Sequence, residues 1–314
     1  GNATGMKNRI INGGMVLDQR NAGASVTAVN TGYSYTVDRF AVYGSVDSKF
    51  TAQQNAGSVT PPTGFTNYLG TTSSSAYSVS SGELFVVRQG IEGLNTADLG
   101  WGTATAKTIT LSFWARSSLT GTFGGSLRNS AGSRSYPFSY TISSANTWEK
   151  KSITVVGDTT GTWLTTNGAG VFMFFGLGVG STYSGAAGAW AAADYRSATG
   201  ATSVVGTSGA TFYVTGVQLE EGNAATSFEF VDYGRLLQQC QRYFAKLQND
   251  GAGGAAILAT GGQRTTTSSW LYVNHPVTMR SEPTVEISQT DLTDFAVYAN
   301  AATITNTFAG FDTS

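Results

Sequence analysis

The sequence predicts a mainly β protein: a sandwich or barrel of antiparallel strands, then one α-helix and a small β-rich C-terminal segment. Three observations predict this fold class. Gly, Thr and Ser account for 40, 44 and 33 of the 314 residues, which is typical of a turn-rich chain. Aromatic residues make up 12% and charged residues only 12%, so material for a core is present and disorder is excluded. Segments of alternating polarity also recur between Gly, Ser, Thr and Asn.

The clearest alternation lies in residues 108–116. Leu111 and Phe113 fall on one face of the predicted strand, whereas Trp114 and Arg116 fall on the other. This is the pattern of a half-buried antiparallel strand. The same reasoning predicts strands at residues 39–43, 84–88, 135–142, 151–156, 171–179 and 211–219. No helical run interrupts these segments, so a parallel α/β sheet is disfavoured.

One helix is predicted after the strands. Asp232 suits the N-cap position, and residues 233–247 contain no Pro and no Gly after Gly234. Three- and four-residue spacings place five side chains on one apolar stripe, namely Leu236, Cys240, Tyr243, Phe244 and Leu247. Two interpretations of the stripe stay open: it packs on its own sandwich, or it is an oligomer interface that meets its copies around a three-fold axis.

The chain divides into three predicted parts. Residues 1–231 form the sandwich, 232–247 the connecting helix, and 248–314 a β-rich C-terminal domain. Strands in this last part are predicted at residues 255–259, 270–277, 284–288, 295–299 and 303–308. A domain of about sixty residues has a marginal core of its own. We therefore expect it to gain burial against a neighbour or in an oligomer.

Composition excludes several classes of function. The net charge of −1 gives no basic field to hold nucleic acid or an anionic membrane. A single Cys excludes internal disulfides and a Cys-based zinc site, and a single His disfavours His-rich metal sites. The most apolar run, residues 171–177, is far too short to cross a membrane. We therefore expect no nucleic-acid partner and no membrane insertion.

Several segments, taken together and in order, resemble a known family. Residues 8–21 read NRIINGGMVLDQRN and resemble the opening of many bacteriophage tail-fibre and virion proteins. The segments similar to the middle of these proteins, and to their closing strand and following helix, are TLSFWARS at 110–117, GDTTGTW at 157–163, GVQLEEG at 216–222, ATSFE at 225–229 and CQRYF at 240–244. The resemblance covers roughly residues 8–246.

The resemblance implies a jelly-roll sandwich similar to carbohydrate-binding modules. It also implies a place on the exterior of a phage particle, commonly as a homotrimeric fibre or appendage in contact with other virion proteins. No catalytic residues come with it.

Trp114 and Arg116 are the first candidates for binding glycan. They lie opposite the predicted core face, where the Trp ring would stack on a pyranose and the Arg would donate to hydroxyls. The alternative is that loops or a neighbouring chain cover Trp114.

Three further aromatic residues are glycan-binding candidates. Tyr136 and Tyr140 alternate on one face with Phe138, and this row is either a binding face or part of the core. Trp190 lies in the long Gly- and Ala-rich loop at residues 181–193. It is either an exposed anchor for a ligand or a plug that closes one end of the sandwich.

The sequence is poorly equipped for catalysis. A glycosidase needs two carboxylates in one cleft, but Glu220 and Glu221 are adjacent and would point to opposite faces of a strand. Nothing pairs the other candidates, which are Glu149, Asp158 and Asp194. His275 is predicted to be structural or exposed, and Cys240 to be a small buried hydrophobe. We therefore expect the protein not to be an enzyme.

No cofactor is expected, with one reservation for Ca²⁺. Jelly-roll modules often carry a structural Ca²⁺, which needs several oxygen ligands from loops. The carboxylates nearest to the family motifs are those of Asp18, Asp158 and Glu220, and no EF-hand spacing exists.

The sequence as a whole therefore favours a phage virion protein, most simply a tail-fibre or appendage component that attaches to host surface glycan through exposed aromatic residues. The alternative is a purely structural virion part without receptor binding, such as a capsid decoration, head fibre, collar or fibre shaft. A polysaccharide depolymerase is the third hypothesis.

Overall fold

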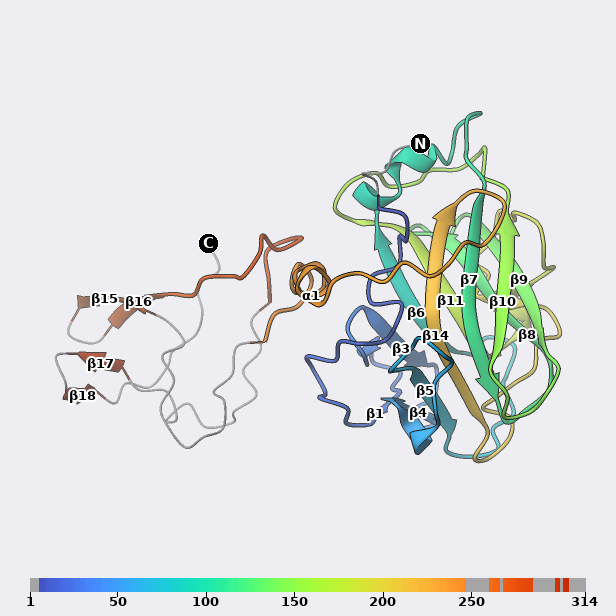
Figure 1. Ribbon diagram of the computed structural model, residues 1–314, viewed down its shortest axis with the longest axis horizontal. Helices are drawn as coiled ribbons and strands as arrows, with labels where there is room; N and C mark the ends of the chain where they lie inside the picture. Colours follow the sequence, from blue (N-terminus) through green and yellow to red (C-terminus); the bar gives the residue numbers. More distant parts are fainter. Residues whose placement is uncertain (1–5, 247–259, 266–267, 285–296, 300–301, 305–314) are drawn as a thin grey trace. The chain divides into compact units, whose positions relative to one another are not determined.

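The protein was analysed as a computed structural model that describes residues 6–246, 260–265, 268–284, 297–299 and 302–304. The chain forms two compact units, residues 1–240 and 241–314. The first unit contains two six-stranded antiparallel sheets, here called sheet A and sheet B, which face each other as two layers (Figure 1). The predicted β-sandwich is therefore confirmed.

Sheet A has the strand order β1-β4-β5-β14-β7-β10. Its strands are β1 (Val26–Thr27), β4 (Phe50–Gln54), β5 (Leu69–Ser73), β14 (Thr211–Glu221), β7 (Ile109–Ser117) and β10 (Glu149–Val155). Every neighbouring pair is antiparallel. A bulge interrupts the pairing of β14 with β7 between Thr215 and Gln218.

Sheet B has the order β2-β3-β6-β11-β8-β9. Its strands are β2 (Ser34–Tyr35), β3 (Phe40–Gly44), β6 (Leu84–Glu92), β11 (Ala169–Val179), β8 (Gly121–Asn129) and β9 (Ser135–Ile142). Sequential strands from β6 to β11 pass repeatedly between the two sheets, which is the interleaved order of a jelly roll.

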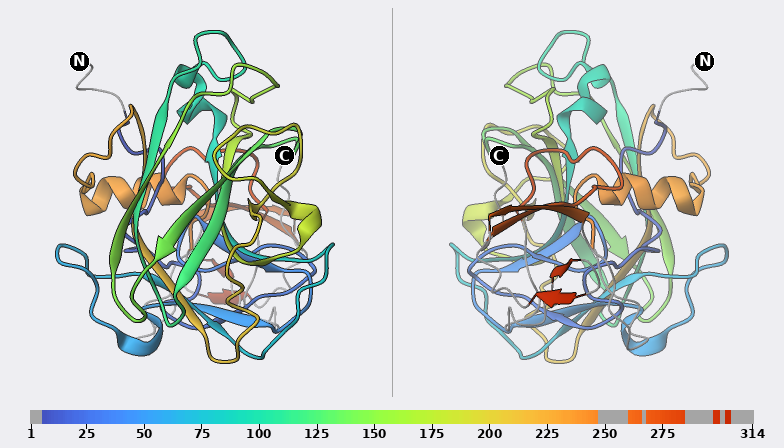
Figure 2. Two further views of the ribbon diagram at one scale, coloured as in Figure 1. Left: turned by 90° about the vertical axis from the view of Figure 1, so that its right-hand side faces the viewer. Right: turned by 90° about the vertical axis from the view of Figure 1, so that its left-hand side faces the viewer.

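Short elements fill the connections. These are the 3₁₀ turns η1 (Ala56–Ser58), η2 (Gly93–Asn95), η3 (Ala97–Leu99) and η4 (Ser181–Tyr183), and the parallel pair β12 (Ser184–Gly185) and β13 (Ser197–Ala198). The β12–β13 region, yellow in Figure 2, lies against sheet B. There the Ser126 hydroxyl donates to the carbonyl of Tyr195. Part of the outer face of sheet B is thereby covered.

The core lies between the sheets and is rich in aromatic residues. Phe113 of β7 and Phe175 of β11 are fully buried and meet edge to face across the layers, with ring centroids 4.9 Å apart. Phe212 of β14 also packs on Phe175. Burying such a side chain stabilises the fold by roughly 1.5–3 kcal/mol. The alternation predicted for residues 108–116 therefore places Leu111 and Phe113 in the core.

The sequence underestimates the number of strands. Strands β4, β5 and β8 were not predicted. β8 reads GTFGGSLRN, and its glycines resemble loop residues. These glycines form a strand because neighbouring groups lie too close for larger side chains: a Cβ at Gly125 would lie 2.2 Å from the carbonyl oxygen of Phe174. Tertiary packing, not local propensity, makes this segment a strand.

The helix is shorter than predicted. Helix α1 spans Tyr233–Gln241, and the carboxylate of Asp232 accepts from the Arg235 amide as the N-cap prediction requires. The prediction that the helix continues to residue 247 is wrong for residues 242–246, which are not helical. There the Arg242 carbonyl accepts from the amide of Arg280 instead of continuing the helical ladder.

The second unit contains two described hairpins. They are β15 (Thr260–Thr265) with β16 (Ser268–Tyr272), and β17 (Val297–Ala299) with β18 (Ala302–Ile304). The strands predicted at 270–277, 295–299 and 303–308 overlap three of these in part. The strand predicted at 255–259, and residues 285–288 of the one predicted at 284–288, lie outside the described residues.

Candidate functional site

Residues 8–13 contact the segments 216–222 and 225–229 and so join distant parts of the sandwich. Asn8 donates from its side chain to the Val217 carbonyl at 3.1 Å and accepts from the Leu219 amide at 3.0 Å. Gly13 lies against the same strand, because a Cβ there would stand 2.0 Å from the Val217 oxygen. The carboxylate of Glu229 accepts from the Asn8 amide. These motif residues therefore build the framework and are not free to contact a ligand.

The outer face of β14 is covered by the chain that follows it. Glu220 is only 3% exposed, and its carboxylate accepts from both the amide and the hydroxyl of Thr226. Gln218 is fully buried beside it and donates to Glu220 at 2.8 Å. Although burial alone would raise the pKa of Glu220, the hydrogen bonds from Thr226 hold it below its ordinary value.

Trp114 and Arg116 lie on the outer face of sheet A, and both are half-buried. Phe65 and Trp114 crowd Gly216, which has φ +61° and no room for a side chain. Arg116 donates to the Asn146 carbonyl at 2.9 Å and lies 5.4 Å from the ring centroid of Tyr213. Both proposed contacts for a sugar are therefore partly occupied by the protein itself.

Trp190 packs at one end of the sandwich. Its ring meets those of Trp101, Trp163 and Tyr136 edge to face at 5.3, 5.4 and 5.2 Å, and its indole N–H donates to the Val156 carbonyl. The geometry is that of a plug over the core. This placement agrees with the second of the two interpretations given above, in which Trp190 closes one end of the sandwich.

Tyr136 and Tyr140 point into the core, with 9% and 6% of their surface exposed. Tyr140 packs edge to face on Phe113 at 5.0 Å, and burial raises the pKa of its hydroxyl well above the ordinary value. The hypothesis that these side chains form an exposed binding face is corrected here, because the alternation of β9 turns them toward sheet A.

Helix α1 ends at Gln241, so only Leu236 and Cys240 of the predicted oligomer stripe lie on the helix. Leu236 and Cys240 are 8% and 1% exposed. Leu236 lines a cavity together with Ile10, and the charges of Asp38 and Arg39 act on Cys240, so both side chains face residues of their own sandwich. Burial raises the pKa of the Cys240 thiol far above its ordinary value, which leaves it no thiolate character. Tyr243 and Phe244 are half-buried, and Leu247 lies outside the described residues.

A site that the sequence reasoning missed lies on the outer face of sheet B. The guanidinium of Arg88, in β6, lies 3.1 Å from the ring centroid of Tyr33 and 4.7 Å from that of Phe172. Tyr33 also packs on Tyr43 at 5.2 Å. All four side chains are half-buried, so each keeps an exposed edge. We call these four residues the Arg88 site.

The cross-strand register explains why these residues come together. Arg88 pairs with Phe174 of β11 and Ala41 of β3, and Phe172 pairs with Gly90 of β6. Gly90 has no side chain, so the ring of Phe172 reaches over it toward Arg88: a Cβ at Gly90 would stand 2.9 Å from that ring. A small residue on one strand thus makes room for an aromatic residue on the next.

Two more arginines border the Arg88 site. Arg196 forms a two-pronged pair with Asp194, at 2.8 Å for each contact, and Arg128 donates to the same carboxylate at 2.6 Å. Arg196 also donates to the Tyr33 hydroxyl at 3.3 Å. Burial opposes ionisation of Asp194, but the two arginines hold the pKa of its carboxyl below the ordinary value.

The Arg88 guanidinium is the exception in this group. Among the described residues, no side chain or carbonyl oxygen forms a hydrogen bond or an ion pair with it, whereas Arg128 and Arg196 share Asp194. One guanidinium without a carboxylate partner in the described part of the chain therefore stands beside two that share a carboxylate. A sequence signal exists in hindsight, because alternation puts Arg88 on the outward face of the predicted strand 84–88. Its partners Tyr33 and Phe172 are too distant in sequence to be foreseen.

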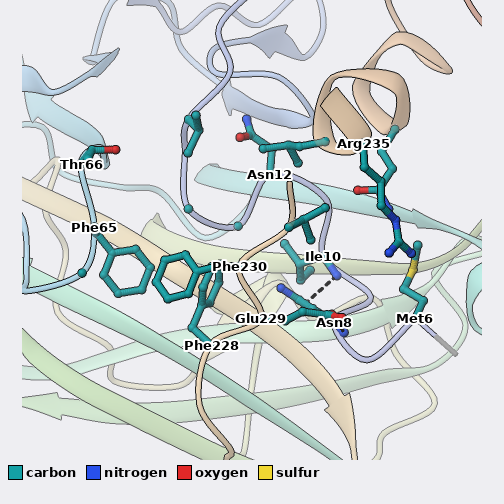
Figure 3. A pocket seen from close by; sticks show the side chains of 17 residues that line it. Met6, Asn8, Ile10, Asn12, Phe65, Thr66, Phe228, Glu229, Phe230 and Arg235 are labelled. Atoms are coloured by element: carbon teal, nitrogen blue, oxygen red, sulfur yellow. Dashed lines mark hydrogen bonds between the residues drawn. The ribbon is translucent and has the colours of Figure 1, made fainter. Parts of the chain in front are cut away.

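A separate cavity of about 240 Å³ is lined in part by the N-terminal segment from Met6 to Val16. Figure 3 shows Phe65, Phe228 and Phe230 turned toward one another on one side of it, with Met6 and Arg235 on the other. The Phe228 and Phe230 rings meet edge to face at 4.9 Å. Phe230 is 66% exposed, which is unusual for so large an apolar side chain.

The carboxylates considered for catalysis have separate partners. Asp158 pairs with Arg134, Glu149 with Lys151, and the exposed Glu221 with Lys107. Asp194 and Glu220 have the partners described above. Within the described residues, no two of these carboxylates share a partner. His275 is exposed and lies outside the strands.

The carboxylates considered for Ca²⁺ are also engaged. Asp18 accepts from the amides of Asn21 and Gly23, as in a turn. In the described residues, no group of three or more Asp, Glu, His or Cys side chains is gathered to hold a metal ion. Within the same residues, no helix has the length and apolar character needed to span a bilayer.

No protein-family model matches the sequence, and no curated protein matches it. The chain is similar to the enzymatically active domain of tailspike protein 4 from bacteriophage CBA120, at 12% identity over 68% of this chain and 21% of that one, with a TM-score of 0.35. It thus spans about a fifth of the tailspike chain.

Two carbohydrate-binding modules are similar to a comparable extent. One is TmCBM61 in complex with β-1,4-galactotriose, at 8% identity over 69% of this chain and 100% of that one, with a TM-score of 0.33. The other is the family 11 module from Clostridium thermocellum in complex with a mixed-linked tetrasaccharide, at 11% identity over 65% and 98%, with a TM-score of 0.30. Each alignment covers about two thirds of this chain.

Proposed function

We propose that this protein is a component of a phage tail fibre or similar virion appendage, and that it attaches to host surface glycan through the Arg88 site. The family motifs in residues 8–246 support the virion assignment. One observation carries the binding assignment: a half-buried guanidinium lies between two aromatic rings on an outer sheet face and has no protein hydrogen-bond partner among the described residues.

The chemistry of the Arg88 site suits a sugar. Aromatic rings offer apolar surface to the C–H face of a pyranose, and a fixed guanidinium donates several hydrogen bonds in one plane. Stacking on Tyr33 restrains the side chain before the ligand arrives, so less conformational entropy is lost on binding. A flat face of this kind binds weakly on its own, and several copies in one appendage would raise the avidity.

Binding of the purified protein to a glycan array and to host cells tests this proposal. We expect signal from the wild-type protein and its loss in Arg88→Ala and Tyr33→Ala. Unchanged binding in both variants would remove the assignment to the Arg88 site. Absence of any glycan or cell binding by the wild-type protein would contradict the attachment function itself.

A specific observation favours a second candidate, a purely structural virion part. Phe230 and Tyr233 are 66% and 60% exposed and are only three residues apart. Large exposed apolar side chains mark surfaces that meet other proteins. In this role the patch would be buried against another virion protein or another copy of the chain, and a homotrimer is the oligomer that we propose.

Solution mass tests the proposed trimer, and binding measured on the same samples separates the structural candidate from the attachment protein. We expect a trimer for the wild-type protein and a shift toward monomer for the double variant Phe230→Ser, Tyr233→Ser. A wild-type monomer at micromolar concentration would contradict the trimer. Glycan and cell binding measured on the same samples shows whether attachment depends on assembly.

A further inference from the structure

The charge balance around the Arg88 site is uneven. Arg128 and Arg196 share the carboxylate of Asp194, whereas no carboxylate in the described residues forms an ion pair with Arg88. The charges that act on Arg88 include those of Arg196 and Arg128. The three guanidinium groups share two aromatic neighbours: Arg128 lies 5.4 Å from the ring centroid of Phe172, which Arg88 also contacts, and Arg196 lies 5.1 Å from that of Phe174. Such a group of cations attracts an anion.

Stacking determines which part of Arg88 is available. The guanidinium lies with its carbon 3.1 Å from the Tyr33 ring centroid, so the contact uses the flat face of the group. The N–H donors of a guanidinium lie in its plane, and a face contact leaves them free. Two parallel N–H groups match the two oxygens of a carboxylate or phosphate better than they match a single hydroxyl.

We propose that the Arg88 site selects anionic sugars, with the fork of Arg88 holding an acidic group on the sugar ring while Tyr33 and Phe172 fix the orientation of the fork. This inference rests on the proposed glycan-binding function and names its ligand class. The acidic group is a uronic acid carboxylate or a phosphate ester, because each presents two oxygens that can accept both N–H groups of the fork. Arg196 and Arg128 contribute long-range attraction, since Asp194, Ser130 and the Tyr33 hydroxyl already accept hydrogen bonds from them.

The position on the sheet supports an extended ligand. Arg88 lies on β6, with β3 on one side and β11 on the other, and the half-buried Tyr43 and Phe172 stand on those two strands. Neutral sugar units on either side of the acidic unit would therefore meet an aromatic ring. A polysaccharide with an acidic residue in its repeat fits this arrangement better than an isolated anion does.

The experiment compares matched acidic and neutral ligands on the intact chain. One pair is tetragalacturonate and its fully methyl-esterified form, and the other is a mannose-6-phosphate oligosaccharide and its dephosphorylated form. Calorimetry is done at low and physiological salt. We expect at least one acidic probe to bind ten times more tightly than its neutral partner, and the preference to fall as salt rises.

Variants of Arg88 test whether the preference for acidic ligands arises at the Arg88 site. Loss of charge-assisted hydrogen bonds in Arg88→Ala should weaken binding of the acidic probe by roughly 10- to 100-fold. Arg88→Lys keeps the charge but loses the fork, so it should fall between wild type and Arg88→Ala. Lys107→Ala removes one positive charge from an exposed ion pair with Glu221 and is the matched control, which should bind as the wild type does.

The outcomes separate the two proposals. If acidic and neutral probes bind equally, or if Arg88→Ala keeps the preference, the anionic selectivity is overturned while glycan binding stands. If no acidic probe binds but neutral glycans do, the inference is likewise overturned. If the wild-type protein binds neither these probes nor any glycan or host cell, the attachment function itself fails. The two pairs show whether the acidic group is a carboxylate or a phosphate.

Discussion

Strand β14 of sheet A and strand β6 of sheet B use the polar residues of their outer faces in opposite ways. On sheet A, Gln218 and Glu220 are buried under the chain that follows β14 and satisfy one another and Thr226. On sheet B, Arg88 keeps an exposed edge and finds only aromatic rings. The polar groups on the outer face of β14 stabilise the fold itself, whereas Arg88 on β6 keeps hydrogen-bond donors available for a ligand.

This difference shows how to separate framework from site in a β-sandwich. A buried polar residue with all its partners stabilises the fold, because removal of one partner leaves another group desolvated and unpaired. A polar residue that is restrained but unpartnered contributes little to stability and remains able to bind. The four predictions that follow test the contrast, from the largest expected effect to the smallest.

Asn8→Ala should give the largest loss of stability. It removes hydrogen bonds to the Val217 carbonyl and from the Ile10 and Leu219 amides, all in a buried region. We expect the free energy of unfolding to fall by about 3 kcal/mol in urea. Asn30→Ala, at an exposed position, is the control and should change it by less than about 0.5 kcal/mol. A loss below about 1 kcal/mol for Asn8→Ala would contradict the framework role.

Glu220 should make stability depend on pH. Its folded pKa is lowered from the ordinary 4.5, because the hydrogen bonds from Thr226 outweigh the opposing effect of burial. The unfolded chain therefore takes up a proton first as the pH falls. The stabilisation is present above about pH 4.5 and is lost as the pH drops through the folded pKa.

The variant Glu220→Gln isolates that contribution. Thermal unfolding from pH 7 to pH 3 should show a smaller drop in melting temperature for the variant than for the wild type, with a loss of about 1–2 kcal/mol at pH 7. Glu221→Gln, in the exposed pair with Lys107, is the matched control. Parallel curves for wild type and Glu220→Gln would refute the assignment.

Arg88→Leu should change stability little. Its stacking on Tyr33 and Phe172 contributes only about 0.5–2 kcal/mol at a half-buried site, and the Leu side chain recovers part of the packing. We expect the urea midpoint to stay close to that of the wild type while glycan binding is lost. A loss of more than about 3 kcal/mol would mean that Arg88 belongs to the framework, as Glu220 does.

Trp114→Ala should have the smallest effect on binding. The ring is half-buried beside Phe65 and Gly216, and the neighbouring Arg116 already donates to Asn146. We expect the affinity for glycan to change by less than about threefold, well below the effect of Arg88→Ala. A loss as large as that of Arg88→Ala would restore the outer face of sheet A as the binding surface.

Much of the framework could be predicted from the sequence. The period-two alternation in residues 108–116 and 135–142 marks the strands β7 and β9, because strand side chains must alternate between core and solvent. The N-cap at Asp232 is equally local. The Gly-rich β8 escaped prediction, because its glycines serve close approaches to distant segments.

The candidate site was predicted less well, for a similar reason. Trp114 and Arg116 were chosen because they face away from the core, but alternation does not say what covers the outer face. Tyr136 and Tyr140 show the same limit, since a row of aromatic residues has the same pattern whichever way it faces. The position of a sheet within the sandwich decides whether such a row faces the core or the solvent.

The sequence by itself determined the fold class, the strands with clear alternation and the scarcity of groups for chemistry, because composition and two-residue periodicity are local properties of the chain. Only the tertiary structure decided which outer face stays open. The contacts that matter join Arg88 to Tyr33 and Phe172, which are 55 and 84 residues away along the chain. Contacts at such separations depend on strand order and register, and no local pattern encodes them.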